Sequence, residues 1–285
     1  GALLNLNNFV ERVASLDMTA ATVDSGLSTL FLNSGGVTTH ASATGSTILG
    51  HLDLGGGVRV FDIASGVAAP DLLVSAVVSG GGVTKNGGGN LQFSGANTYA
   101  GLTTINDGFI IITQPTGLGT SAAGAVLSGT GALSLVGVTV TSETLTNNSS
   151  STILQASGVS GWGSNVVLNA DLQIQSLSGT FDISGAISGT GGLTKELSGT
   201  LRFSGSSANN YDGPTTVNEG VLELAKASAI NSSSLLTIGD GVGGVGADIV
   251  RYFASNPVNS AVPIRILDSG LLDMNGFSDS LGVLT

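Results

Sequence analysis

The sequence contains no cysteine, and few of its residues carry a charge. The absence of cysteine excludes disulfide bonds, thiol catalysis and metal sites built on thiolates. Charged residues make up 9% of the chain, whereas an average protein contains about 25%. Coiled coils and folds rich in surface helices need many Glu, Lys and Arg residues, so this composition argues against both classes.

Positive charge is especially scarce. The chain has 8 Lys and Arg residues against 19 Asp and Glu residues, which gives a formal net charge of -11. The basic residues occur singly along the sequence and form no patch, so we expect no nucleic-acid partner. No apolar run approaches the roughly 20 residues that a membrane span requires, so we do not expect the chain to be embedded in a membrane.

The residues that are present favour short strands. Of the 285 residues, 41% are hydrophobic, so the chain can bury a sizeable core and does not have the composition of a disordered protein. There are 45 glycines, without the three-residue period of collagen. Short units alternate apolar and polar residues and end at Gly, Asn or Ser, as in Leu133-Ser134-Leu135. This pattern predicts strands with one buried face, separated by tight corners.

Two long segments of the chain repeat one another, at residues 78–112 and 187–224. Both contain an apolar residue before Ser-Gly, then Thr-Lys, a Leu-x-Phe-Ser-Gly unit, an Asn/Tyr loop and a Thr-Thr-x-Asn unit. The second copy has a two-residue insertion in the Asn/Tyr loop, as loops of solenoid repeats often do. The aligned residues are Lys85 with Lys195, Leu91–Gly95 with Leu201–Gly205, Tyr99 with Tyr211, and Thr103–Gly108 with Thr215–Gly220.

The two ends of the chain share a second motif. Residues 4–16 match residues 272–284, beginning with Leu4–Phe9 against Leu272–Phe277. The nearest candidate for a helix, Val10–Met18, overlaps this motif, and the motif itself indicates strand and turn. The chain therefore ends on the pattern with which it begins, as a section of a longer array or fibre would.

Many short strands are compatible with a sandwich, a propeller or a parallel β-solenoid. Sandwich strands are usually longer and joined by hairpins with fixed two-residue turns, which this sequence lacks. We therefore predict an all-β fold, a parallel β-helix of about a dozen coils at roughly 20–25 residues each, in one continuous segment over residues 1–285. Leu91 and Leu201 should lie in its apolar core.

The two long repeats resemble the autotransporter-associated β-strand repeat, also called the passenger-associated transport repeat, at Gly81–Ile110 and Gly191–Leu222. This resemblance implies a right-handed parallel β-helix on a bacterial cell surface or in the extracellular space. One departure is Lys195-Glu196-Leu197-Ser198, where the family has a corner richer in glycine. The repeat is a feature of architecture and by itself assigns no activity.

Groups able to perform chemistry are few. His40 and His51 stand in Ser/Thr/Gly-rich sequence without convergent partners, so we expect ordinary surface histidines. The carboxylates are spread singly, and a glycosidase pair would need two of them on adjacent coils, for example Asp182 and Glu223. We regard this chemistry as the least favoured alternative, and we predict no catalytic residue, no metal ligand and no cofactor.

One segment fits the calcium-binding nonapeptide G-G-x-G-x-D-x-U-x, at Gly243–Arg251, with its aspartate at Asp248. Asp240 lies nearby, but such sites need tandem copies, because one turn supplies only half of the oxygen ligands. A glycine-rich corner is therefore the favoured interpretation of Gly243–Asp248, and calcium binding is left open.

Three functions remain. The first is a structural stalk or fibre segment of a bacterial surface protein that stacks end to end on other copies or adjoining repeats. The second is an adhesin-type passenger that binds a glycan or surface, with the best hints at Ser157–Ser164, which holds Trp162, and at Tyr252–Pro257. The third is a polysaccharide-active enzyme. The first is favoured because the composition lacks the groups that perform chemistry.

Overall fold

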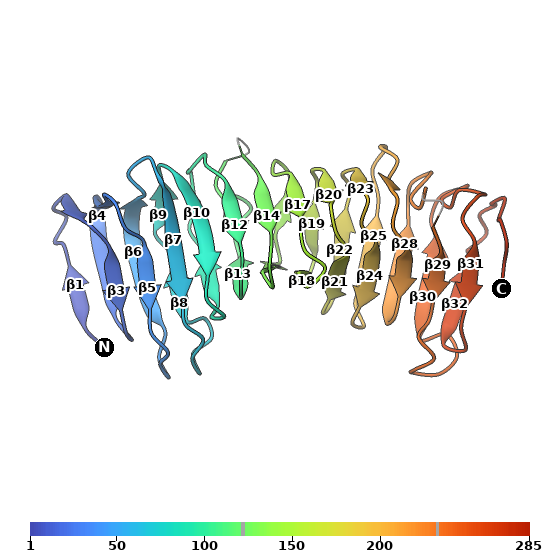
Figure 1. The fold of residues 1–285 in the computed structure, drawn as a ribbon, viewed down its shortest axis with the longest axis horizontal. Helices are drawn as coiled ribbons and strands as arrows, with labels where there is room; N and C mark the ends of the chain where they lie inside the picture. The colour runs from blue at the N-terminus through green and yellow to red at the C-terminus, as the bar shows by residue number, and fades with distance from the viewer. Residues whose placement is uncertain (121–122, 232–233) are drawn as a thin grey trace. The chain divides into compact units, whose positions relative to one another are not determined.

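The structure is a computed structural model that describes residues 1–120, 123–231 and 234–285. Over these residues the chain is all-β and contains no helix, so no helix there could cross a membrane. The fold is a parallel β-solenoid of about 13 turns, as the sequence predicts (Figure 1). Every strand pairing described is parallel, because each coil returns in the same direction as the one before.

The chain divides into two compact units. The N-terminal unit comprises residues 1–134 and 142–144, and the C-terminal unit comprises residues 135–141 and 145–285. The first long repeat lies in the N-terminal unit and the second in the C-terminal unit. The expectation of one continuous segment over residues 1–285 stays a prediction.

Coils of the N-terminal unit contribute strands to two sheets. Its first sheet contains β1 (Leu3–Asn5), β4 (Thr22–Leu32), β6 (Ser46–Asp53), β8 (Leu72–Val74), β11 (Leu91–Phe93) and β13 (Phe109–Ile112), with β2 (Glu11–Val13) and β9 (Val77–Ser79) paired at its side. Its second sheet contains β3 (Leu16–Met18), β5 (Val37–Thr39), β7 (Val58–Ile63), β10 (Gly82–Asn86), β12 (Thr103–Ile105) and β14 (Ala125–Leu127). Strand β15 (Ala132–Val136) spans the boundary between the units.

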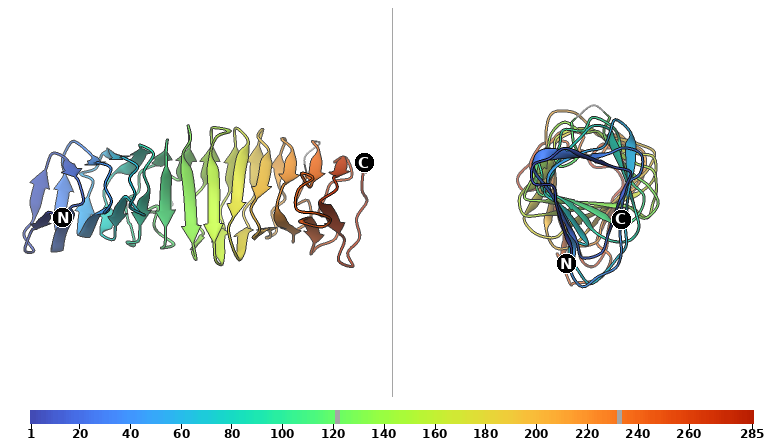
Figure 2. Two further views of the ribbon diagram at one scale, coloured as in Figure 1. Left: turned by 90° about the horizontal axis from the view of Figure 1, so that it is seen from below. Right: turned by 90° about the vertical axis from the view of Figure 1, so that its left-hand side faces the viewer.

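Coils of the C-terminal unit contribute strands to three sheets, and successive coils lie side by side in Figure 2. The first sheet contains β18 (Ile153–Ser157), β21 (Leu172–Ser176), β24 (Leu193–Glu196), β27 (Thr215–Val217), β29 (Leu236–Ile238) and β31 (Ile264–Ile266). The second contains β17 (Leu145–Asn147), β20 (Val166–Leu168), β23 (Ile187–Gly189) and β26 (Asn210–Tyr211). The third contains β16 (Thr139–Val140), β19 (Ser160–Trp162), β22 (Thr180–Ile183), β25 (Thr200–Phe203), β28 (Gly220–Leu224), β30 (Asp248–Tyr252) and β32 (Gly270–Asp273).

The core is a column of apolar side chains supplied by alternate strand positions. Leu91 and Phe93 point inward from β11, while Gln92 between them is half-buried, and Leu201 and Phe203 do the same from β25. This alternation follows from the period of two in a strand. The assignment of Leu91 and Leu201 to the core is confirmed, since both are at most 1% exposed.

The matching end motifs fold into the same turn. Asn7 and Asn8 have φ values of 49° and 65°, and Asn275 and Gly276 have 47° and 78°. The backbone amide of Asn7 donates a hydrogen bond to the side-chain oxygen of Asn5 at 2.8 Å, and that of Asn275 donates to Asp273 at 2.9 Å. Asn and Gly are favoured there because they tolerate positive φ. Strands occupy residues 11–13 within the first motif and residues 16–18 at its end, so the candidate helix Val10–Met18 is strand and turn as expected.

Candidate functional site

A buried lysine closes one corner of each long repeat. Lys85 is fully buried, and its Nζ donates hydrogen bonds to the carbonyl oxygens of Asn86 (2.9 Å), Gly87 (2.5 Å) and Asp107 (3.0 Å). The first two carbonyls belong to its own coil and the third to the next coil. An ammonium has three donors, so all of them are used in holding two coils together.

Lys195 repeats this arrangement in the second copy. Its Nζ donates to the carbonyl oxygens of Glu196 (3.0 Å), Leu197 (2.5 Å) and Glu219 (2.8 Å). Burial lowers the pKa of Lys195 to about 8, while the charges of Glu219, Glu196 and Asp248 act in the opposite direction. Burial likewise lowers the pKa of Lys85 to about 8. Neither lysine has a donor left for a ligand.

The departure at Lys195–Ser198 places a leucine in a strained conformation. Leu197 has φ = 66°, where the first copy has Gly87 with φ = 73°. A residue with a Cβ disfavours this region by about 1–2 kcal/mol, because the Cβ approaches the following carbonyl oxygen. The corner carbonyl of Leu197 must nevertheless face Lys195, so the geometry of the lysine corner outweighs the local preference of leucine.

The Asn/Tyr loop is also turned inward. Asn97 is buried, and it accepts a hydrogen bond from the Val78 amide (2.9 Å) and donates one to the Gly117 carbonyl (2.7 Å). Asn209 makes the same pair of bonds, to Ile187 (3.0 Å) and Ala229 (2.7 Å). Each asparagine therefore bridges the coils before and after its own, which satisfies backbone groups that would otherwise be unpaired.

The tyrosine of each copy is fully buried and bonded through its hydroxyl. Tyr99 pairs with Thr103 at 2.8 Å, and Tyr211 pairs with Thr215 at 2.6 Å. Burial raises the pKa of Tyr211 to about 12 and that of Tyr99 further. The lysine and asparagine of the repeat motif thus bond neighbouring coils, the tyrosine bonds a nearby threonine, and all three side chains are buried.

The two copies differ in the coil that follows the lysine corner. Strand β14 is followed by a short turn over residues 128–131, and Ala132 N donates to Gly108 O at 2.9 Å. In the second copy the equivalent strand β29 is followed by a longer, glycine-rich loop over residues 239–247. Asp248 then stacks on Gly220, the counterpart of Gly108. Because an amide in a parallel ladder bonds the carbonyl one residue before its partner, Ala132 pairs with Phe109 and corresponds to Ile249, which pairs with Val221. Asp248 therefore occupies the place of Gly131.

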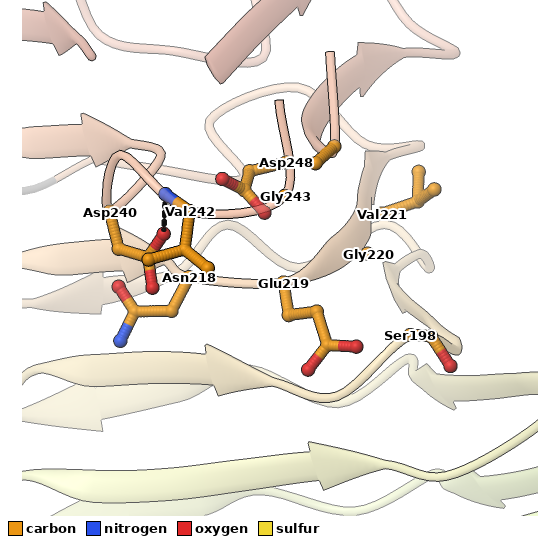
Figure 3. A pocket seen from close by; sticks show the side chains of 10 residues that line it. Ser198, Asn218, Glu219, Gly220, Val221, Asp240, Val242, Gly243 and Asp248 are labelled. Atoms are coloured by element: carbon orange, nitrogen blue, oxygen red, sulfur yellow. Dashed lines mark hydrogen bonds between the residues drawn. The ribbon is translucent and has the colours of Figure 1, made fainter. Parts of the chain in front are cut away.

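The glycine-rich loop borders a pocket of about 450 Å³, which we call the Asp248 pocket. Asp248 is 1% exposed, and neither of its carboxylate oxygens has a hydrogen-bond partner. Figure 3 shows its carboxylate pointing toward Val242 and Gly243. A buried carboxylate without a hydrogen-bond partner is costly, so this residue is the most unusual feature of the pocket.

Two further carboxylates line the Asp248 pocket, and they point in different directions (Figure 3). Asp240 is exposed and accepts a hydrogen bond from the Val242 amide at 2.7 Å, while Glu219 is exposed on the opposite side. Across the described parts of the chain, no group of three or more His, Asp or Glu residues is placed to hold a metal ion. Calcium binding by Gly243–Asp248 remains open.

The expected carboxylate pair does not form. Asp182 faces Arg202 on the next coil, and Arg202 in turn faces Glu223. The prediction that Asp182 and Glu223 meet on adjacent coils is therefore wrong, because one full coil separates them. Asp182 instead accepts a hydrogen bond from Ser204 at 2.8 Å, and Arg202 lies 3.6 Å from Glu223. The coil register, which the sequence alone did not supply, decides this.

The aromatic hints for a binding loop also fail. Trp162 lies in β19 and is fully buried, and Tyr252 in β30 is fully buried as well. Phe253, which is 38% exposed, is covered on one side by Arg202, 5.5 Å from its ring centre. Strand periodicity places these side chains inward, so neither segment presents a large aromatic surface.

The histidines behave as ordinary surface residues. His40 is exposed, and its Nε2 lies 2.7 Å from Asp17 on the preceding coil. His51 is exposed, and its backbone amide is bonded to Ser25. The two imidazoles share no partner among the interactions described.

The sequence did not indicate that two carboxylates, Asp248 of the calcium-type segment and Glu143, would be buried. Glu143 is 2% exposed, neither of its oxygens accepts a hydrogen bond of ordinary geometry, and burial raises its pKa to about 7, while the Gly124 amide acts in the opposite direction. Extending the alignment of the two repeats by one coil would have indicated both, since the counterparts in the other copy are the uncharged residues Gly131 and Val262.

Comparison with known proteins agrees with this architecture. The model of the passenger-associated-transport-repeat family matches residues 83–112 and 193–224. The chain is 33% identical over 177 residues to "Adhesin BmaC autotransporter" of Brucella suis biovar 1 (strain 1330); the match covers 58% of this chain and 4% of that protein. No solved structure matches the chain. The protein thus carries two passenger-associated transport repeats in a parallel β-solenoid, which supports a secreted or surface-exposed passenger.

Proposed function

We propose that this chain is a structural segment of a bacterial surface passenger, in which the β-solenoid holds other parts of the protein away from the cell. The observation that carries the proposal is the use of the repeat's polar residues. Lys195, Asn209 and Tyr211 are all buried and bonded within or between coils, as are their counterparts in the first copy. A stalk requires strong coil-to-coil bonding and no chemistry at its surface.

The test uses the full chain, displayed on a bacterial outer membrane with a peptide tag inserted in the exposed loop at Val245. A structural passenger places the tag where an antibody binds it on intact cells, and the displayed chain resists external protease. Lys195→Met, which removes the corner bonds, should lower protease resistance, whereas Val242→Ser, a change at an exposed position, should not. Antibody access only after lysis would reject the surface location.

End-to-end contact with other copies or adjoining repeats is part of this proposal. Two observations support it: residues 4–16 and 272–284 form the same turn, and exposed apolar side chains such as Leu4 and Phe9 lie in the first of these motifs. Head-to-tail contacts of this kind generate filaments. Sedimentation of the purified chain should then show mass rising with concentration, and Phe9→Asp should suppress it. A monomer at every concentration tested would contradict stacking.

An adhesin function is the second candidate, because the similar protein of Brucella suis is named as an adhesin. On this view a polar face of the solenoid contacts a surface glycan. The amide ladder of Gln155 and Gln175, bonded at 3.0 Å, is an example of the neutral polar surface available. Glycan-array binding by the chain, lost on Gln175→Ala with unchanged thermal stability, would favour this candidate over a purely structural one. We propose no enzymatic activity.

A further inference from the structure

Asp248 is not required by the fold in which it lies. The first repeat builds the same stacking position with Gly131, which is also buried and stacks on Gly108, the counterpart of Gly220. The carboxylate of Asp248 is equally buried and has no hydrogen-bond partner. A buried charge that the architecture can omit at no cost is unfavourable unless it serves another purpose.

Lys195 does not satisfy this carboxylate. It lies near enough for the two charges to interact, but its three donors are taken by the carbonyl oxygens of Glu196, Leu197 and Glu219. The oxygens of Asp248 thus keep their capacity to accept hydrogen bonds. A ligand that donates hydrogen bonds and carries positive charge would supply what the residue lacks.

The loop that covers Asp248 is loosely packed. A Cβ added at Gly241 or Gly244 would meet no atom within 4 Å, and Val242 and Val245 are 69% and 94% exposed. Few contacts therefore hold residues 241–246 in place, and low contact density of this kind is typical of segments that open locally. A small shift of Val242 and Gly243 would expose the carboxylate to the pocket.

The lining of the Asp248 pocket indicates the chemistry of its occupant. Three carboxylates, on Glu219, Asp240 and Asp248, make it negative, while Val221, Val242 and Ala247 provide aliphatic walls. The carboxylates point in different directions, which does not suit a metal ion that needs six to eight converging oxygens (Figure 3). The lining contains no aromatic residue on which a sugar ring could stack.

We propose that the Asp248 pocket binds an aliphatic primary ammonium group, such as that of a lysine side chain or a small diamine. The ammonium donates to the oxygens of Asp248, and the methylene chain packs on the valine side chains. A volume of about 450 Å³ is within the range of small-molecule sites. This inference does not depend on the stalk function, since a pocket at one corner leaves the coil contacts unchanged.

The test is isothermal titration of the full chain at low ionic strength with 1,4-diaminobutane and with Nα-acetyl-lysine N-methylamide. The first probe represents a free diamine and the second a lysine within a protein, so their relative affinities distinguish the two sources. Nα-acetyl-norleucine N-methylamide, which has the alkyl chain without the charge, is the matched ligand control. Asp248→Asn should weaken binding of the preferred amine at least tenfold, and Asp107→Asn, at the lysine corner of the first copy, should leave it unchanged.

Several outcomes would overturn the proposal. These are the absence of heat with both amines, equal binding of the norleucine compound, unchanged affinity in Asp248→Asn, or binding of calcium chloride in preference to the amines. Because the first repeat has the uncharged Gly131 at this position, Asp248→Ala serves as a second variant, and circular dichroism should show that both variants fold. Asp248 variants that lose amine binding but are still displayed on the cell surface would show that amine binding and the structural function are independent.

Discussion

The two long repeats are built alike up to the lysine corner and differ in the coil that follows. The first copy stacks Gly131 on its corner glycine, and the second stacks Asp248 there. A second difference has its acid in the first copy. Thr144 O accepts a hydrogen bond from the Ala125 amide, and Pro263 O accepts the equivalent bond from the Leu236 amide. The residues just before these two carbonyls therefore correspond, and the first copy has Glu143 where the second has Val262. The repeats share a framework, while each carries one buried acid of its own.

This comparison separates residues that make the coils from residues that the coils tolerate. Lysine and asparagine recur with the same partners because each bonds two or three coils at once, and tyrosine recurs with the same threonine four residues along the chain. The buried acids do not recur, because a stacked position needs only a side chain that fits. Differences between internal repeats therefore point to features beyond the fold, as Asp248 does.

The largest expected effect is on the shared core. Leu91→Asp and Leu201→Asp should each destabilise the protein by more than about 4 kcal/mol, because an unpaired charge would be buried in the apolar column. Denaturant unfolding followed by circular dichroism measures the change, and Gln92→Asp at the adjacent half-buried position is the control. Wild-type unfolding of Leu201→Asp would contradict its place in the core.

The lysine corners should show a smaller and unequal effect. Lys85→Met should cost about 3 kcal/mol, because three carbonyl oxygens lose a charged donor. Lys195→Met should cost more, since Asp248 then loses its nearby positive charge. The double variant Lys195→Met with Asp248→Ala should remove this excess in a thermodynamic cycle. Equal losses at the two lysines would show that Asp248 and Lys195 are not coupled.

The buried acid of the first copy should make stability depend on pH. The pKa of Glu143 is raised from 4.5 to about 7, so the folded state holds its proton more tightly than the unfolded state. The resulting stabilisation is complete below about pH 4.5 and is lost as pH rises through 7, a change of roughly 2 kcal/mol. Glu143→Val, which copies Val262, should abolish this dependence and stabilise the protein most at pH 8.

Thermal melting at pH 4 and pH 8 checks this prediction for Glu143, with Glu143→Gln as a polar control that cannot ionise. Equal pH dependence in the wild type and both variants would mean that other groups produce it.

Removal of the second buried acid should stabilise the fold modestly. Asp248→Ala removes the carboxylate, which the first copy lacks at Gly131, and should raise the free energy of unfolding by about 1 kcal/mol, less than for Glu143 because Lys195 lies near. The reciprocal Gly131→Asp should destabilise the first copy, because a Cβ there would lie 2.1 Å from the carbonyl oxygen of Ile105. Calorimetric melting of both variants measures the difference, and a destabilised Asp248→Ala would show that the carboxylate has an undetected structural partner.

The smallest effect concerns the strained corner of the second copy. Leu197→Gly copies Gly87 and should stabilise the protein by about 0.5–1 kcal/mol, because relief of strain at positive φ exceeds the added entropy of the unfolded chain. Gly87→Leu should have the opposite sign. Chemical denaturation measures both changes, provided that the dependence of the unfolding free energy on denaturant concentration is the same in each variant. A destabilised Leu197→Gly would indicate that the contacts of the leucine side chain stabilise the protein by more than the backbone strain costs.

Sequence patterns predicted the fold well because a solenoid depends on local signals. Alternation placed Leu91 and Phe93 in the core, and the glycine-rich corners followed from residues that tolerate positive φ. Predictions that required knowledge of coil register were less successful. Asp182 and Glu223 are separated by a full coil, because the length of each intervening loop decides which residues become neighbours.

The sequence by itself thus determined the class of fold, the repeat and the core, since each is written in the spacing of residues along the chain. The tertiary structure decided which groups Lys195 bonds and that Arg202 lies between Asp182 and Glu223. It also decided that Asp248 and Glu143 are buried. The physical reason is that stacking brings together residues about one coil apart. An added loop such as residues 239–247 changes that distance without changing the pattern of either strand.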